Sequence, residues 1–204
     1  MKRSYTFALT LALALSLVAF GSLWRTARAA DEPAPAIIGM MIEDFTLPDP
    51  NGQAHTLASL KGKHGTVLIF IATRCPVSNG YNERMEKLAQ DYAAHGVSVI
   101  GINANSTEPA SEVKSHAAEK HLTFAILKDN GNKIADRLGA AHTPEAFLLD
   151  ASNKLVYHGR IDNSLNPANV SANDLRDAID AILAGKPIAK TEAKAFGCSI
   201  KRAE

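Results

Sequence analysis

The sequence has few cysteines, little net charge and no long basic run. Its 204 residues include two cysteines, and 22 Lys and Arg residues against 21 Asp and Glu residues give a formal net charge of +1. Strong attraction to nucleic acid or to an anionic membrane therefore has no support. A small molecule or a disulfide-bearing protein fits better as a partner. With 46% hydrophobic residues, the chain has enough apolar material for one ordinary α/β domain.

The apolar run near the N-terminus is too short to predict a membrane span. Leu9 to Phe20 falls below the ~20 residues that a spanning helix needs. Lys2 and Arg3 precede this run, and Ala27-Arg28-Ala29 follows it as a small-x-small cleavage site, which is the pattern of a secretory signal peptide. We expect residues 1–29 to be a signal peptide and 30–36 a flexible linker, the alternative being an uncleaved anchor. We expect the protein to be exported to the periplasm or another extracytoplasmic space and to have no stable membrane span after cleavage.

The pattern of apolar runs predicts a mixed sheet. Thr66 to Ala72 is continuously apolar and β-branched, as in a central strand that is buried on both faces. A helical stretch ending at Gly96 separates it from a second apolar run, 97–103, so the two strands are expected to be parallel. Only three residues separate the later strands 146–150 and 154–161, which predicts antiparallel neighbours.

Turn and cap signals place the remaining elements. They predict a hairpin around Asn51-Gly52 and then one helix with Tyr81, Met85, Leu88 and Tyr92 on one face. A helix over 109–121, capped by Ser106 or Thr107, a strand at 124–127 and a short helix around 134–138 are expected to follow. The final helix is expected to be capped by Ser171 and to end at Gly185. The expected domain covers residues 37–190, and the expected tail covers 191–204 and carries Cys198.

Cys75 is the strongest candidate for a reactive residue. It lies directly after a buried strand and directly before a helix, where free backbone N–H groups and the positive end of the helix dipole stabilise a thiolate. Such surroundings lower a cysteine pKa from ~8.5 to ~3.5–7.5, and the thiolate is the species that attacks disulfides and peroxides. Arg74 adds a neighbouring positive charge, and Pro76 suits the first helical position. The alternative is that Cys75 is a small buried apolar residue.

The sequence lacks a second cysteine close to Cys75. The segment Cys75-Pro76-Val77-Ser78 has serine where a second thiol would complete a C-x-x-C pair, so the resolving thiol is either external or Cys198. Ser78 is expected to cap the helix or to hydrogen-bond the thiolate. The tail is long enough to fold back over Cys75, and a free, unpaired Cys198 remains the alternative.

The chain resembles the thioredoxin-like superfamily, specifically its redoxin branch, which is related to the alkyl hydroperoxide reductase and thiol-specific antioxidant proteins. The resemblance lies in Asp44-Phe45-Thr46-Leu47, the strand ending at Cys75-Pro76, Gly101-Ile102-Asn103, Thr143-Pro144-Glu145 and the tail Gly197-Cys198-Ser199-Ile200-Lys201. It implies an α/β fold of thioredoxin type, with a mixed central sheet, an N-terminal β-hairpin and flanking helices.

The resemblance also implies a thiol-disulfide oxidoreductase. Cys75 and Cys198 are then the catalytic residues, and Arg74, Pro76, Ser78, Thr143 and Pro144 are expected to bind substrate. Pro144 resembles the cis-proline that faces the active cysteine and offers backbone groups to an extended substrate in the manner of strand addition. The expected partners are protein or small-molecule disulfides, or a peroxide, with an external thiol as reductant. No cofactor and no metal are expected.

Three other functions stay open. A peroxiredoxin-like peroxide reductase is the first, although Ala72 and Leu68 replace the Thr or Ser and the proline that such enzymes carry, and Arg160 is the remaining candidate for a cation near the site. A copper-binding protein using Cys75 and His142 is the second. A non-catalytic adaptor that uses the peptide groove is the third. His142 is also a weak candidate for a base.

Overall fold

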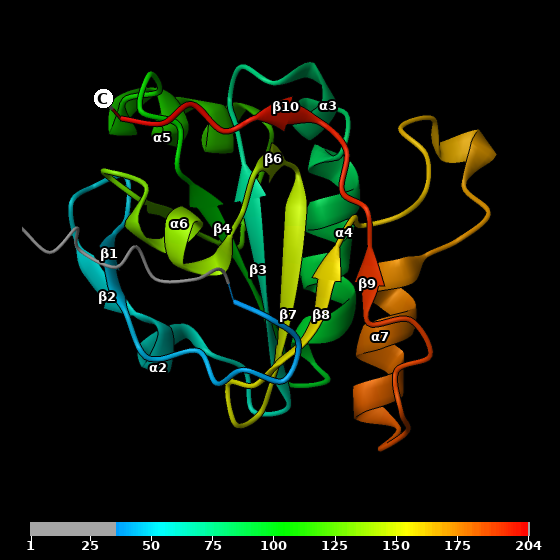
Figure 1. Cartoon of the computed structure of the whole chain (residues 1–204). Helices are drawn as coiled ribbons and strands as arrows, with labels where there is room; N and C mark the ends of the chain where they lie inside the picture. Colours follow the sequence, from blue (N-terminus) through cyan, green and yellow to red (C-terminus); the bar gives the residue numbers. More distant parts are fainter. Residues whose placement is uncertain (1–35, 204) are drawn as a thin grey trace, which may run out of the picture. The chain divides into compact units, whose positions relative to one another are not determined.

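The computed structural model describes residues 36–203, and the predicted signal peptide and most of the predicted linker lie outside them. A six-stranded mixed sheet forms the centre of the fold, in the order β5-β4-β3-β7-β8-β9 (Figure 1). The α/β class predicted from the sequence is thereby confirmed. The strands are β3 (Gly65–Ile71), β4 (Val97–Asn103), β5 (Ala125–Lys128), β7 (Glu145–Asp150), β8 (Leu155–Gly159) and β9 (Glu192–Ala193).

Strand β3 is central and buried along its whole length. It pairs in parallel with β4, as predicted, and antiparallel with β7. Strand β7 pairs antiparallel with β8, which confirms the predicted neighbours. Because side chains alternate along a strand, Val67 and Ile69 join one core cluster while Leu68 and Phe70 join the other. The continuous apolar run therefore reflects burial on both faces of the sheet.

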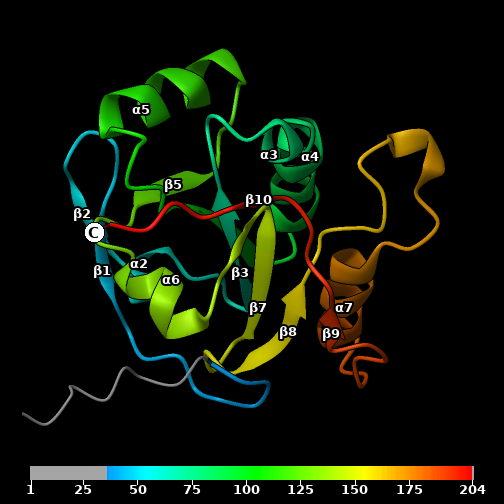
Figure 2. The same cartoon turned by 45° about the horizontal axis from the view of Figure 1, so that its top comes forward.

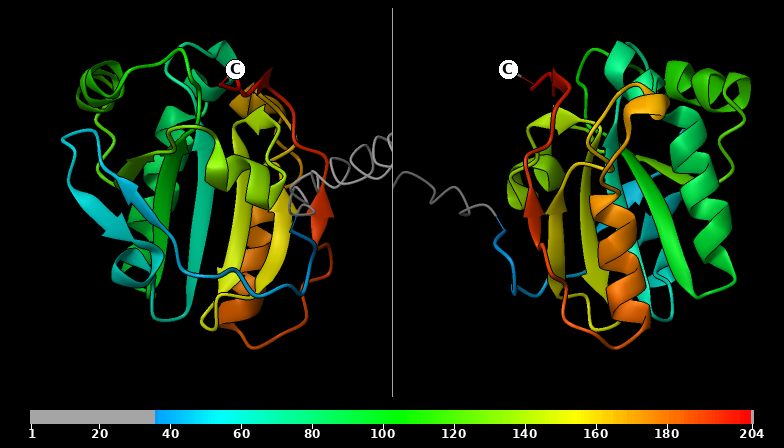
Figure 3. Two further views of the ribbon diagram at one scale, coloured as in Figure 1. Left: turned by 60° about the vertical axis from the view of Figure 1, so that its left-hand side comes forward. Right: turned by 90° about the vertical axis from the view of Figure 1, so that its right-hand side faces the viewer.

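Helices cover each face of the sheet. On one face, α4 (Asn82–Ala93) and α7 (Asp174–Leu183) lie in front of the strands in the right-hand view of Figure 3 and pack their apolar side chains into the first cluster. On the other face, α2 (Leu57–Leu60) and α6 (Lys133–Leu138) supply Leu57, Ile134 and Leu138 to the second cluster. Helix α5 (Ala110–Glu119) contributes Val113 to the first cluster.

The helical stretch after Cys75 differs from the prediction. It is split into a short α3 (Pro76–Asn79) and the longer α4, instead of being one continuous helix. The Tyr81 N–H bonds to the carbonyl of Ser78, only three residues back, so the last turn of α3 tightens and ends the helix. The predicted apolar stripe nevertheless holds, because Tyr81, Met85 and Leu88 are all buried in one cluster.

Two predicted helix caps are also wrong. Helix α7 begins at Asp174, and its N-cap residue is Asn173. Ser171 instead exchanges hydrogen bonds with Asn163. The 3-10 turn η1 (Pro167–Asn169) lies between these two residues in the chain. Pro109 precedes α5, and Ser106 instead bonds to the C-terminal tail. Both serines are used in contacts between distant segments, which local sequence rules do not detect.

Two small antiparallel pairs complete the fold. The predicted hairpin is present as β1 (Thr46–Pro48) and β2 (Ala54–Thr56). The second pair joins β6 (His142–Thr143) to β10 (Cys198–Ser199) in the tail, which crosses the end of the sheet beside α3 (Figure 2). Strand β9 lies in the same tail, so the tail belongs to the sheet as well as to its rim. Within residues 36–203, no helix has the length and apolar character that crossing a membrane requires.

Candidate active site

Cys75 lies where the sequence predicts it, between β3 and α3. It is the N-cap residue of α3, and its own sulfur accepts a hydrogen bond from the backbone N–H of Ser78 at 3.3 Å. Pro76 occupies the first turn, where its missing N–H leaves no donor unpaired. The sulfur therefore faces the free N–H groups of the helix start, an arrangement that favours the anionic form.

The Thr143-Pro144 segment lies against the Cys75 sulfur. The peptide bond between these two residues is cis, as the resemblance implies. The Cys75 thiol donates to the carbonyl of Thr143 at a sulfur–oxygen distance of 3.3 Å. The cis-proline segment and the reactive cysteine thus form one site, although 68 residues separate Cys75 from Thr143.

The tail brings the second cysteine to the same place. In the antiparallel pairing of β10 with β6, Cys198 is opposite Thr143 and Ser199 is opposite His142. The Cys75 sulfur is 3.3 Å from the carbonyl oxygen of this same Thr143, so the pairing brings Cys198 beside it. Both cysteines are free thiols in this structure. Two sulfurs far apart in the sequence are therefore neighbours at the start of α3.

The surroundings distinguish the two thiols. Burial raises the pKa of Cys75, but interactions with the Cys198 thiol, the Ser78 N–H and the Thr143 side chain outweigh it and hold the pKa below its usual value. For Cys198, the neighbouring Cys75 sulfur raises the pKa, and partial burial raises it further. The pKa of Cys75 is therefore lower than that of Cys198, so the thiolate forms first at Cys75.

A buried carboxylate holds the loop that leads to Cys75. Glu108 accepts hydrogen bonds from the backbone N–H groups of Thr73 (2.9 Å) and Arg74 (3.1 Å) and from the side-chain amides of Asn103 (2.5 Å) and Asn105 (3.0 Å). These bonds keep the pKa of Glu108 below its usual value, although burial alone would raise it. No sequence pattern pointed to Glu108, because its partners lie in two separate stretches, 73–74 and 103–105, that only the fold brings together.

Arg74 does not bring a free cation to the sulfur. Its guanidinium is mostly exposed and forms a bidentate ion pair with Glu112, whose carboxylate also accepts from the Thr73 hydroxyl. This pairing lowers the pKa of Glu112 to about 2. The Cys75 sulfur therefore depends on hydrogen bonds and the helix start for its stabilisation.

Ser78 and Pro76 occupy different surroundings. Ser78 is fully buried, and its hydroxyl accepts a hydrogen bond from the Ala72 N–H at 3.1 Å. Its side chain is therefore not a helix cap, because the cap is the Cys75 sulfur, while its backbone N–H is the group that binds that sulfur. Pro76 is exposed beside Cys75.

Another buried carboxylate positions the cis-proline segment. Glu145 accepts from the N–H groups of Ala141 (2.7 Å) and His142 (2.8 Å), and its other oxygen lies 2.6 Å from the His158 ring nitrogen. Burial raises the pKa of Glu145, but these bonds lower it more, so the residue is held as an anion. Glu145 is part of the quoted Thr-Pro-Glu motif, but no positioning role was predicted for it.

Two predicted polar contributors are engaged by carboxylates instead of by the sulfurs. The ring of His142 is 3.9 Å from Glu145, and no hydrogen bond joins it to Cys75. Arg160 forms an ion pair with Asp174 at 2.6 Å, which neutralises the cation expected near the site. In residues 36–203, no group of three or more His, Cys, Asp or Glu side chains is arranged to hold a metal ion.

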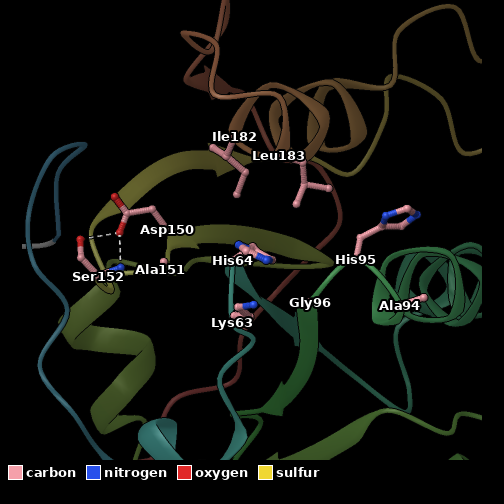
Figure 4. Close-up of a pocket in the computed structure, with 10 residues that line it drawn as sticks. All are labelled: Lys63, His64, Ala94, His95, Gly96, Asp150, Ala151, Ser152, Ile182 and Leu183. Carbon is pink, nitrogen blue, oxygen red and sulfur yellow. Dashed lines mark hydrogen bonds between the residues drawn. The ribbon is translucent and has the colours of Figure 1, made fainter.

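A cavity of about 760 Å³ lies at the opposite end of the sheet (Figure 4). His64, at the start of β3, and Asp150, at the end of β7, both line it. Cys75 follows the other end of β3, which spans seven residues and hence roughly 20 Å. The cavity is therefore separate from the cysteine site. Its remaining lining includes Lys63, His95, Ser152, Ile182 and Leu183.

A helix-capping cysteine opposite a cis-proline, on a mixed sheet with helices on both faces, defines a thioredoxin-like redox protein. The chain belongs to the AhpC/TSA family, whose model matches residues 38–158. Its curated relatives include thiol-disulfide oxidoreductases, which identifies the chain as an oxidoreductase of this kind. The thiol-disulfide oxidoreductase ResA of Halalkalibacterium halodurans is 33% identical over 144 residues, covering 71% of this chain and 80% of that protein.

Solved structures share the fold of this chain. A hypothetical protein from Sinorhizobium meliloti superposes with a TM-score of 0.76 at 37% identity, covering 82% of this chain and 96% of the other. An uncharacterized conserved protein from Geobacillus kaustophilus gives a TM-score of 0.77 at 31% identity, covering 82% and 93%. The similarity thus extends over most of the described domain.

Removing the Cys198 thiol is expected to raise the pKa of Cys75. In Cys198→Ala, the sulfur loses a hydrogen-bond donor, so the thiolate forms at higher pH, whereas Cys198→Ser retains a donor and shifts the pKa less. The measurement is the rate of Cys75 alkylation by iodoacetamide as a function of pH, read by mass spectrometry. Ser199→Ala, an exposed neighbour in the tail, is the control. An unchanged midpoint in Cys198→Ala would contradict this assignment.

Proposed function

We propose that Cys75 is the attacking nucleophile of this oxidoreductase and that Cys198 is its resolving cysteine. The observation that carries the proposal is that Cys75 and Cys198 both lie against Thr143 at the N-terminus of α3, next to the cis-proline peptide bond. Cys75 has the lowered pKa of a nucleophile, and Cys198 lies within reach of its sulfur. Disulfides are the substrates, and an external dithiol restores the reduced protein.

Two exchange steps reduce one disulfide. The Cys75 thiolate attacks one sulfur of the substrate, a mixed disulfide forms, and the first substrate thiolate leaves. Cys198 then loses its proton and attacks the Cys75 sulfur, so that a Cys75–Cys198 disulfide forms and the second substrate thiolate leaves. Two electrons pass from the protein to the substrate, and both substrate thiolates take up protons. The low pKa of Cys75 makes it a good leaving group when the external dithiol attacks the oxidised pair.

Disulfide reduction fits this site better than peroxide reduction. The position where a peroxiredoxin carries Thr or Ser is Ala72, and the nearby Ser78 hydroxyl is already bound to the Ala72 N–H. Arg160 is paired with Asp174, so its charge is not offered to a peroxide oxygen. Peroxide reduction remains the second candidate, because the family model that matches is that of the AhpC/TSA proteins.

The N-terminal sequence supports export of the protein. Lys2 and Arg3, the apolar run and Ala27-Arg28-Ala29 form a signal-peptide pattern, which lies outside the described residues. An extracytoplasmic space would supply the disulfides on which the site acts.

Counting the thiols released by the reduced protein tests the division of roles. Mixed with bis(2-hydroxyethyl) disulfide, each wild-type molecule is expected to release two molecules of 2-mercaptoethanol, since attack and resolution both occur. Cys198→Ser is expected to release one and to retain a mixed disulfide at Cys75. Cys75→Ser is expected to release almost none, because the pKa of Cys198 is raised. Equal release by Cys75→Ser and wild type would exclude Cys75 as the nucleophile, and rapid consumption of hydrogen peroxide would favour the second candidate.

Export is tested by the N-terminus of the mature protein. We expect chain isolated from the extracytoplasmic fraction of a bacterial host to begin near Ala30, because the cleavage site follows Ala29. The measurement is mass spectrometry of the intact protein, with Ala27→Asp and Ala29→Asp together as the cleavage-blocked control. A cytoplasmic protein that retains residues 1–29 would overturn the proposal of export.

A further inference from the structure

The backbone edge beside the cis-proline is already occupied. Strand β6 pairs with β10 of the same chain, and the Ile200 N–H continues the ladder by bonding to the Ala141 carbonyl at 3.0 Å. This is the edge that the sequence analysis assigned to an extended substrate by strand addition. Figures 1 and 2 show β10 of the tail beside β6. The tail therefore lies on the edge that a bound polypeptide would use, and Cys198, opposite Thr143, takes the place of a substrate cysteine.

The tail is held before it reaches the site. Strand β9 pairs in parallel with β8, and the Arg160 N–H donates to the Ala193 carbonyl at 3.1 Å. Closer to the site, Phe196 packs edge-on against Tyr81, with ring centroids 6.1 Å apart. These contacts fix the direction in which the tail approaches Cys75.

The tail is held again after it leaves the site. Ile200 is buried in the second core cluster, at 7% exposure. The Lys201 N–H donates to the Asn105 side chain at 2.7 Å, and the Ser106 N–H donates to the Lys201 carbonyl at 2.9 Å. Cys198 is therefore held from both sides rather than by a single pairing. Further bonds join Arg202 to the Ala140 carbonyl and the Ala203 N–H to Asn132.

Gly197 shows how closely the tail approaches the cis-proline segment. A Cβ atom at this position would lie 2.0 Å from the Thr143 carbonyl oxygen, far inside van der Waals contact. Its φ of +150° is also one that other residues rarely adopt. No space remains between tail and β6 for a second strand.

From this arrangement we infer that the substrate is a low-molecular-weight disulfide, not an extended polypeptide. The inference rests on the proposed role of Cys75. An entering peptide would have to displace the tail from β6. Because the tail belongs to the same chain, its effective concentration at this edge is on the order of millimolar or higher. A small disulfide needs no strand pairing, and it reaches the sulfurs where Pro76 is exposed and Cys198 is only half-buried.

The test compares two disulfides with the same chemistry in the Cys198→Ser background, where reaction stops at the first step. One is bis(2-hydroxyethyl) disulfide. The other is an unstructured twelve-residue peptide whose central cysteine carries the same 2-mercaptoethanol group as a mixed disulfide. Mass spectrometry measures the rate at which each modifies Cys75. We expect the small disulfide to react about tenfold faster or more, because the peptide competes with the tail.

Two variants open the edge by different means in the same background. One removes residues 200–204, and Gly197→Val forces the tail away from Thr143 through the clash described above. In whichever variant folds, the peptide is expected to react within about threefold of the small disulfide, since it no longer competes with the tail. Lys194→Ala, at an exposed tail position, is the matched control and should leave both rates unchanged.

The outcomes separate the two proposals. Equal rates for both disulfides with the tail intact would overturn the inference while leaving Cys75 as the nucleophile. A peptide rate that stays low in the opened variants would overturn it as well, because the tail would not be the cause. Failure of both disulfides to modify Cys75 would refute the proposed function itself.

Discussion

The close approach of Cys198 to the Cys75 sulfur, both against Thr143, is the contact on which the site depends. It supplies a donor to a sulfur that burial alone would keep protonated. It also places the sulfur that we propose as resolving beside the one that we propose as attacking. A C-x-x-C protein obtains this second thiol from the next helical turn, whereas here Ser78 occupies that position and the thiol comes from the tail.

The fold supports that contact from three directions. The doubly buried strand β3 leads to Cys75, and Glu108 fixes the backbone of the loop between them. Glu145 holds the backbone around His142, which leads into the cis-proline segment and provides the pairing edge for the tail. Each carboxylate is buried and satisfied by several donors, so both act as rigid anchors rather than as acids or bases in the reaction.

The same contact has a cost for substrate access. A tail that places Cys198 over Cys75 also covers the edge that a polypeptide would use, and Cys75 is only 3% exposed. Activation and protection of the thiolate are thus consequences of one structural element. If the tail stays in place, the chemistry is confined to small disulfides. An external dithiol would then attack the half-buried Cys198 sulfur more easily than the Cys75 sulfur.

Much of this arrangement could be predicted from the sequence. The apolar run 66–72, the Cys75-Pro76 junction and the short turn between β7 and β8 are local signals, and all three describe the structure correctly. The contacts of Ser171 and the carboxylate networks could not be predicted, because they join segments that are apart in the sequence. The break between α3 and α4 comes from one local hydrogen bond, which the apolar periodicity of the helical stretch does not mark. Strand β9 has only two residues, too few for any periodicity to mark it.

Peptide mapping of the oxidised protein tests the central claim most directly. After mild oxidation at low protein concentration and alkylation of the remaining thiols, digestion without reductant should give one peptide pair that joins Cys75 to Cys198. Mass spectrometry identifies this pair and follows its disappearance on reduction. Recovery of Cys75 and Cys198 on separate peptides, both alkylated or each joined to a second copy of the chain, would contradict the account.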